Sequence, residues 1–427
     1  MDPIAGDEFD LPIPADLAAL RDGGTSFLTN AFRRCGTLGP DNSVTRITEL
    51  RECGGGSTGR KALLSVEYTQ PAGHLPTEMF VKFSRDLDDP ARDIGRFQME
   101  FEVRLALLSR GSRFPIAVPA CLFADYHRES GTGILVTERI SFGLNGIEPQ
   151  YAKCLDYLMP DQLAHYRAIV TALGRLAGTD KGGRLADATQ QFRVDMAKLS
   201  VGERIPRTPA QLQRRVARFA DLTVSNPEIL PANIRSAEFI ARMADQVGLL
   251  AEHESIIWRH LEDNSDFIAL CHWNANVDNA WFWRSGSGVE CGLLDWGCVG
   301  QMNAAMAIWG ALCSAETAVW DNHLDELLAL FAAEFHTSGG PELDIRAFKQ
   351  QVLLYAAIMG IAWLLDVPAY LQAHVPPHVP GRTDSRIAGN ETVRSRLLMM
   401  TNFLNLWETA DFGRVLDELL RLGSAGA

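Results

Sequence analysis

Polar side chains follow three apolar runs between Phe267 and Gly300, and this stretch holds the most concentrated chemistry of the chain. His272 and Asn274 come directly after the first run, and Asn279 lies five residues beyond Asn274. Asp295 ends the third run. Apolar runs bounded by Gly and Ser turns are typical of strands, so the pattern predicts a polar loop and an acidic residue at neighbouring strand ends.

A glycine-rich turn lies further upstream, between two strand-like runs at 44–51 and 62–68. The backbone N–H groups of such a turn can approach phosphates closely, because no side chain intervenes. The next predicted strand, Glu78–Phe83, carries Lys82, and a lysine in an apolar strand is costly to bury without a partner. Taken singly, the two features are equally compatible with a plain hairpin turn and an exposed edge-strand lysine.

The order His272-Trp-Asn274 to Asn279, then strand, turn, strand and Asp295-Trp, resembles the catalytic segment of the protein-kinase-like fold. The closer resemblance is to the aminoglycoside phosphotransferase and choline kinase-like family, whose motifs read His-Gly-Asp-x-x-x-x-Asn and Asp-Trp. Asn274 therefore stands where that family has its catalytic Asp. Ala307 stands where the family usually has a second Asp that braces the loop.

The resemblance implies a two-lobed α+β fold. A small N-lobe of residues 1–140 would hold a five-stranded antiparallel sheet and one helix, and would bind the nucleotide phosphates. The two further strands are predicted at 121–126 and 133–140, and the helix at 94–109, where apolar residues share one helical face. A large, mainly helical C-lobe of residues 141–427 would carry the catalytic loop and the substrate pocket.

The resemblance also implies a nucleotide site. In it the glycine-rich turn covers the phosphates, and Lys82 neutralises their charge. A helix glutamate pairs with Lys82; Glu100 fits the family's local pattern better, and periodicity alone leaves Glu102 open. The hinge around Glu138 meets the adenine through its backbone. The residues assigned to the turn are Gly54, Gly55, Gly56 and Ser57.

Asn279 and Asp295 match the family's metal positions, and they offer the oxygen ligands that Mg²⁺ prefers. Asn274 can orient an acceptor hydroxyl, but a carboxamide cannot take its proton. General acid–base help is worth roughly 100- to 10,000-fold, so the substitution predicts slow turnover. Asp278 is the neighbouring carboxylate that could substitute. His272 is expected to be structural.

The function implied by the resemblance is that of an ATP- and Mg²⁺-dependent phosphotransferase acting on a hydroxyl of a small molecule. The alternative is a pseudokinase that binds nucleotide or a metabolite and regulates a partner without phosphoryl transfer; Asn274 and Ala307 favour it. A third possibility is a kinase fold that performs another reaction. Trp273 replaces the family's common glycine, and we expect its bulk to lie beside the acceptor pocket.

The amino-acid composition limits the kinds of partner and the location that we expect for this chain. Hydrophobic content of 47%, charged content of 22% and a net charge of −13 fit a globular protein. The acidic balance argues against nucleic-acid binding and an anionic membrane surface. The 8 cysteines include no C-x-x-C pair, which argues against zinc and favours a cytoplasmic location. The uncharged run Val352–Leu365 is too short to span a bilayer and predicts a buried helix.

Overall fold

The computed structural model describes residues 4–425 except 55–58, 72, 74, 87, 90–91, 186–190, 193–195, 197–200, 203 and 287. The strands are β1 (Val44–Cys53), β2 (Arg60–Tyr68), β3 (Glu78–Phe83), β4 (Cys121–His127), β5 (Thr132–Glu138), β6 (Ile268–His272), β7 (Ala280–Ser285), β8 (Gly288–Leu293) and β9 (Val299–Asn303). The helices are α1 (Leu17–Arg34), α2 (Arg92–Leu108), α3 (Gln162–Lys181), α5 (Pro209–Ser225), α6 (Ala237–Glu252), α7 (Glu254–Asp263), α8 (Ala304–Leu312), α9 (Thr317–Thr337), α10 (Ile345–Trp363), α11 (Val367–His374), α12 (Ser385–Ala388), α13 (Glu391–Ala410) and α14 (Phe412–Ala425).

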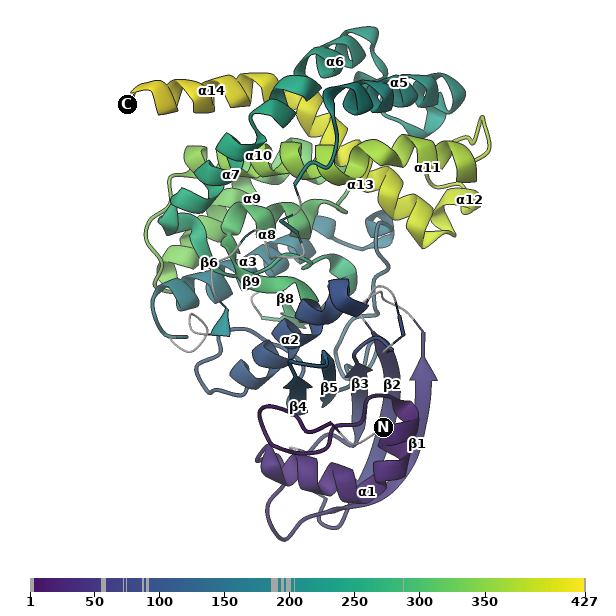
Figure 1. Cartoon of the computed structure of the whole chain (residues 1–427), viewed down its shortest axis with the longest axis vertical. Coiled ribbons are helices and arrows are strands. Elements are labelled where there is room, and N and C mark those ends of the chain that lie inside the picture. Colours follow the sequence, from purple (N-terminus) through teal and green to yellow (C-terminus); the bar gives the residue numbers. More distant parts are fainter. Residues whose placement is uncertain are drawn as a thin grey trace.

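The chain forms two lobes, which Figure 1 shows one above the other. The smaller lobe contains an antiparallel five-stranded sheet in the order β1-β2-β3-β5-β4. The larger lobe is mainly helical and carries two short two-stranded sheets, β6 with β9 and β7 with β8. This is the two-lobed α+β architecture predicted from the sequence, and all five predicted strands of the small lobe are present.

Side chains alternate between the two faces of a strand, and this alternation divides β2 and β3 between two environments. Ala62 and Leu64 are fully buried against one face. Lys61 on β2 and Lys82 on β3, which are paired in the register, face the other side. One face of the sheet therefore supplies a core and the other supplies the wall of a site.

Helix α1 covers the first of these faces. Its buried residues Leu20, Leu28 and Phe32 belong to the same apolar cluster as the buried residues of β2 and β3. The Asp16 side chain caps the helix by accepting from the N–H of Ala19 at 2.8 Å. The helix predicted at 94–109 corresponds to α2, and α1 packs on the other face of the sheet as a second helix of this lobe.

Helix α2 lies on the opposite face, between the sheet and the larger lobe (Figure 1). Met99 and Val103 on α2 pack with Leu135 of β5 in a separate buried cluster. The same helix contacts the short turn Trp296–Cys298 that follows Asp295. It thus joins the sheet to the segment in which the sequence placed the catalytic motifs.

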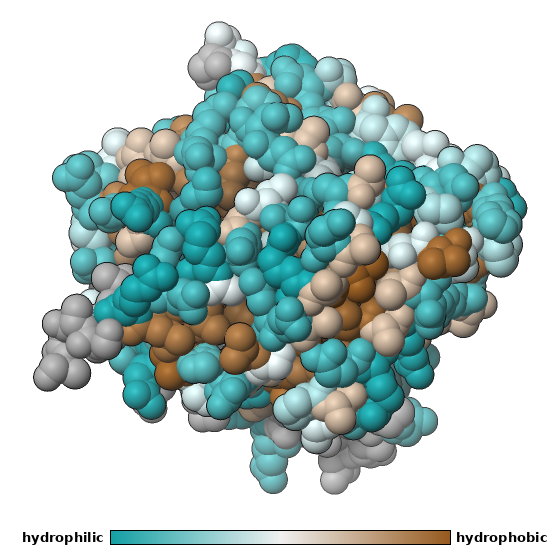
Figure 2. All heavy atoms as spheres, turned by 90° about the horizontal axis from the view of Figure 1, so that it is seen from above, coloured by the Kyte–Doolittle hydropathy of each residue, from teal (hydrophilic) through white to brown (hydrophobic). Residues whose placement is uncertain are grey.

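One helical stretch of the described chain, Ile345–His374, is long and apolar enough to cross a membrane by length and composition alone. Within the protein, 83% of its apolar window is buried. Helix α10, which forms most of it, packs against α8, α9, α13 and α14. The stretch is thus the central core helix of the larger lobe. Figure 2 looks onto this lobe from above and shows separate apolar patches between hydrophilic side chains.

Helix α8 approaches the catalytic segment very closely at Gly310. A Cβ atom at this position would lie 1.8 Å from the backbone oxygen of Trp273. Only glycine lets the helix and the loop meet at this distance. The contact sets the distance between the loop at Trp273 and helix α8.

We expect Gly310→Ala to lower the free energy of unfolding by about 1–3 kcal/mol, because the new methyl group must push the Trp273 backbone away. Gly248→Ala is the matched control: it also lies in a helix, α6, and a Cβ there meets nothing within 4 Å. That substitution should raise stability by about 0.5–1 kcal/mol through helix propensity. Urea denaturation of both variants tests the contact, and equal effects would contradict it.

Candidate active site

A cleft of about 920 Å³ lies between the lobes. The sheet supplies one wall, with residues of β2, β3 and β5, and α2 adds Glu102. The other wall comes from the segment between β6 and β9. It brings together four side chains that the sequence singled out for metal binding and catalysis: Asn274, Asp278, Asn279 and Asp295.

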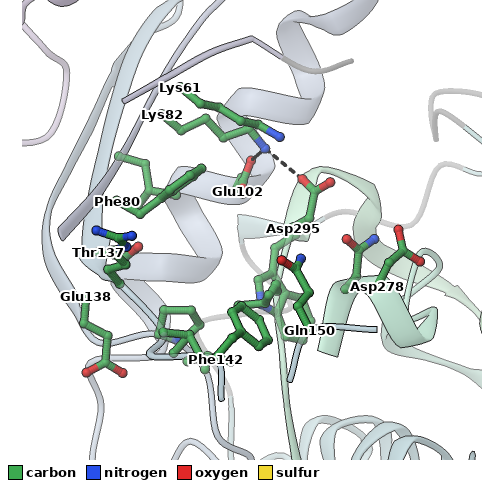
Figure 3. A pocket seen from close by; sticks show the side chains of 18 of the residues that line it. Lys61, Phe80, Lys82, Glu102, Thr137, Glu138, Phe142, Gln150, Asp278 and Asp295 are labelled. Atoms are coloured by element: carbon green, nitrogen blue, oxygen red, sulfur yellow. Dashed lines mark hydrogen bonds and ion pairs between the residues drawn. The ribbon is translucent and has the colours of Figure 1, made fainter. Parts of the chain in front are cut away.

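Lys82 joins the two walls. Its ammonium donates to Glu102 Oε2 on α2 at 2.5 Å and to Asp295 Oδ1 at 2.8 Å (Figure 3). The Lys82 and Glu102 side chains are almost fully buried, at 3% and 6% exposed. Asp295 is the more open partner, with 26% of its side chain exposed, so its carboxylate also faces the cleft.

The three groups of this cluster shift one another's pKa values. Burial alone would lower the pKa of Lys82, but the neighbouring Asp295 and Glu102 carboxylates raise it above its usual value. The Lys82 charge lowers the pKa of Asp295 below its usual range. Burial raises the pKa of Glu102, and Lys82 opposes that shift. Lys82 and Asp295 are therefore both charged at neutral pH.

The assignment of Glu100 as the partner of Lys82 is wrong. Glu100 instead makes ion pairs with Arg104, one turn further along α2, and with Arg128. Residues 100 and 102 lie on opposite flanks of the apolar stripe of α2, and only packing of the helix on the sheet decides which flank faces β3. Glu102, the alternative that periodicity left open, is the partner.

His272 ends β6 and has the structural role that the sequence predicted. Its Nε2 donates to the backbone oxygen of Leu294 at 2.9 Å, and its ring stacks on Trp296 with 4.2 Å between centroids. Burial lowers the pKa of His272 to about 4, so the ring is neutral at physiological pH. It ties the catalytic loop to the residue that precedes Asp295.

Amide side chains hold the catalytic loop together. Asn274 Oδ1 accepts from Asn276 Nδ2 at 2.7 Å, and the Asn274 backbone oxygen accepts from Asn279 Nδ2 at 2.9 Å. The fully buried Asn276 in turn accepts from the hydroxyl of Ser314 at 2.5 Å. Ser314 thus braces the loop from just beyond α8, while Ala307 is simply a buried residue within that helix.

Trp273 points away from the cleft, which corrects the expectation that it lies beside the acceptor pocket. It is 6% exposed, and its indole N–H donates to the Tyr355 hydroxyl at 2.9 Å. The close approach of Gly310 to its backbone explains why the side chain turns toward the helical core. Trp273 therefore anchors the loop from below.

Asp278 does face the cleft (Figure 3). Its neighbour Asn279 also lines the cleft. The Oδ1 of Asp278 is buried and has no hydrogen-bond partner in the described part of the chain. Burial raises the pKa of Asp278, and the charge of Lys153, another lining residue, partly offsets that shift. A carboxylate with a raised pKa and an unused oxygen is suited to accept a proton.

The donor set fits a magnesium ion bound together with phosphates. Asn279 uses its Nδ2 to hold the loop, which leaves its Oδ1 as a ligand, and Asp295 offers a carboxylate oxygen on the same side of the cleft. Mg²⁺ usually takes one or two protein oxygens and completes its shell with phosphates and water. Among the described residues, no group of three or more His, Cys, Asp or Glu forms a metal cluster.

Asp295 adopts a left-handed backbone conformation, with φ of 54°. Such a conformation is uncommon for a residue other than glycine and stores strain, which structures retain mostly where function requires it. Here it turns the chain sharply between β8 and the Trp296 turn. That turn aims the carboxylate at Lys82.

The glycine-rich turn is described only in part. Gly54 lines the cleft, whereas Gly55, Gly56 and Ser57 lie outside the described residues. Glu138 also lines the cleft, at the predicted hinge. Its backbone N–H is already used, since it donates to Ala120 O at 2.9 Å, so a base would have to meet the next hinge residues, of which Ile140 lines the cleft.

Three lining residues carried no signal in the sequence analysis. Phe80 lies two residues before Lys82 on β3 and reaches the cleft on the same face (Figure 3). Lys61 stands directly opposite Lys82 on β2. Lys153 comes from the irregular segment after β5. The alternation of β3 could have found Phe80, but Lys61 and Lys153 require the register and the tertiary fold.

Comparisons with known proteins give a distant structural likeness. No family model matches the chain, and no curated protein does. Among solved structures, it resembles a microcompartment-associated aminopropanol kinase at 14% identity, over 91% of this chain and 99% of that one, with a TM-score of 0.44. It also resembles a spectinomycin phosphotransferase solved with ADP and spectinomycin, at 12% identity over 86% and 94%, with a TM-score of 0.42.

A choline/ethanolamine kinase family protein from Mesorhizobium loti is similar at 14% identity, over 87% of this chain and 92% of that one, with a TM-score of 0.41. These structures are of the kind that the sequence motifs resemble. Because the likeness is distant, the site of this chain stands on its own geometry.

The substitutions Glu102→Gln and Glu100→Gln distinguish the roles of the two glutamates. The first removes a buried charge from the Lys82 group and should lower the free energy of unfolding by about 3 kcal/mol. The second breaks pairs that involve the more exposed Arg104 and Arg128 and should change it by about 1 kcal/mol or less. Chemical denaturation at neutral pH compares them, and a larger loss for Glu100→Gln would contradict the pairing.

His272 makes stability depend on pH in a defined window. Its folded pKa of about 4 lies below its ordinary value of 6.5, so between these values the unfolded chain binds a proton that the folded chain does not. Stability should therefore fall by about 3 kcal/mol as pH drops from 6.5 to 4. In His272→Gln this part of the decline should vanish, whereas His374→Gln, on an exposed side chain, should keep it. Denaturation curves across this range measure both.

Proposed function

We propose that the chain is an ATP- and Mg²⁺-dependent phosphotransferase whose acceptor is a hydroxyl group of a small molecule. The observation that carries the proposal is the buried Lys82–Glu102–Asp295 group at the head of a cleft that also holds Asn279, Asn274 and Asp278. Phosphoryl transfer needs anchored phosphates, a metal site and an oriented acceptor, and each has residues here. The distant resemblance to small-molecule kinases supports the same reaction class.

In this proposal the N-lobe, residues 1–140, holds the nucleotide. The base lies against Phe80, which offers an aromatic face, and against Leu135, and it meets the backbone near Ile140. Lys82 lies where the phosphates would lie. Asp295 and Asn279 would hold Mg²⁺, which would supply positive charge next to the phosphates.

The C-lobe, residues 141–427, holds the acceptor. Asn274 orients its hydroxyl through the amide, and Asp278 takes the proton as the oxygen attacks the terminal phosphorus. The bond from that phosphorus to the bridging oxygen breaks, and the nucleoside diphosphate leaves with the electron pair. Asp278 suits this role because it is the carboxylate nearest in sequence to Asn279, faces the cleft and has a raised pKa.

Thermal denaturation with ATP, with Mg²⁺ and with both tests the nucleotide site. A ligand that binds only the native state stabilises it by about 2.7 kcal/mol at 100 times its Kd. We expect a rise that requires both ATP and Mg²⁺ and that is lost in Asp295→Asn. Asp325→Asn, on an exposed side chain, serves as the control. Absence of any rise at millimolar ATP would refute the proposal.

Turnover distinguishes an enzyme from a silent nucleotide-binding protein. With a panel of small alcohols and amino alcohols, formation of ADP should fall roughly 100-fold or more in Asp278→Asn, while ATP binding persists. Asn274→Asp should raise the rate, because it adds a carboxylate beside the acceptor. ATP binding without turnover in either the wild type or Asn274→Asp would instead favour the pseudokinase alternative.

A further inference from the structure

Two lysines stand side by side on the cleft face of the sheet. The β2–β3 register pairs Lys61 directly with Lys82, and both side chains extend toward the cleft (Figure 3). Like charges directly opposite each other on neighbouring strands destabilise a sheet. Lys61 is only half-buried, but it lies on an inner strand, so it is not a solvated edge residue.

The two lysines differ in what they contact. Lys82 is hydrogen-bonded to two carboxylates, so this three-residue group carries a net charge of −1 when all three are ionised. Lys61 makes no ion pair within 4.0 Å in the part of the chain that the structure describes. It acts on Glu102 and Asp295 through its charge alone, lowering the pKa of both. Its ammonium therefore remains available for an anion in the cleft.

A polyphosphate placed near Asp295 meets two carboxylates and one lysine that already donates to both of them. Without another cationic side chain, the protein's own charge at that end of the cleft is negative when all three groups are ionised, which is unfavourable to an anion. The charge of Lys61 brings the net charge of these side chains to zero, and its ammonium adds free N–H donors. Charge-assisted bonds to phosphate are among the stronger hydrogen bonds in proteins.

We propose that Lys61 is the second cation of the phosphate site and contacts the di- or triphosphate directly, while Lys82 chiefly holds Glu102 and Asp295 in place. The inference rests on the proposed function and adds a residue that binds the nucleotide. It also gives a reason for the like-charged pair: a bound polyphosphate lies between the two ammonium groups. Affinity should then depend on the number of phosphates.

Lys61→Gln tests this by isothermal titration with Mg²⁺ present. Binding of ATP should weaken about 10- to 100-fold, as expected for loss of a hydrogen bond to a charged group. Binding of ADP should weaken less, and adenosine should bind unchanged. Lys61→Arg should retain most of the affinity.

Arg60→Gln is the matched control. Arg60 has the same charge and is the neighbour of Lys61 on β2, but it points to the opposite face and pairs with Asp86 at 2.9 Å. The Arg60→Gln substitution should leave ATP binding unchanged. An equal loss in Arg60→Gln, or wild-type affinity in Lys61→Gln, would overturn the assignment, because the effect would then be general or absent.

Tripolyphosphate, which lacks a base, separates this inference from the proposed function. If the protein binds tripolyphosphate and Lys61→Gln does not, the phosphate site stands even where ATP itself fails to bind. If neither tripolyphosphate nor ATP binds the wild type, the assignment of Lys61 is wrong together with the proposed function. If ATP binds equally well to the wild type and to Lys61→Gln, only the assignment is wrong.

Discussion

A single buried ammonium group, that of Lys82, connects the parts of this protein that meet at the cleft. Lys82 lies on the sheet and pairs with Glu102 on α2 and with Asp295 in the larger lobe. An unpaired charge at this depth would be strongly destabilising, so the position of α2 on the sheet and the approach of the two lobes are coupled to the same interaction. The strained backbone of Asp295 is one consequence, since the carboxylate must reach back to β3.

The catalytic loop is organised differently, by neutral groups. Asn274, Asn276 and Asn279 exchange hydrogen bonds with one another, and Ser314 holds the middle one from below. This amide network holds the loop through neutral groups, so the network itself places no negative charge beneath the site. The carboxylate of Asp278 then stands apart from the network, and its pKa is set mainly by burial and Lys153.

The sequence was sufficient for the order of the elements and for the residues that short motifs carry. The alternating strands and the spacing from His272 to Asp295 are local features, and the structure has both. The choice between Glu100 and Glu102 was not local, because it depends on how α2 rotates on the sheet. Lys61 and Ser314 were out of reach for the same reason, since strand register and helix packing bring them to the site.

Helix α1 gives the small lobe a mechanical property. With α1 on one face and α2 on the other, the sheet is the middle layer of a sandwich, and its strands have little freedom to twist independently. The N-terminal segment adds a further restraint, because the buried Asp125 accepts from the N–H groups of Glu8 and Phe9. Any widening of the cleft must therefore move β2, β3 and α1 together. A disturbance on the outer face of α1 would then change the width of the cleft.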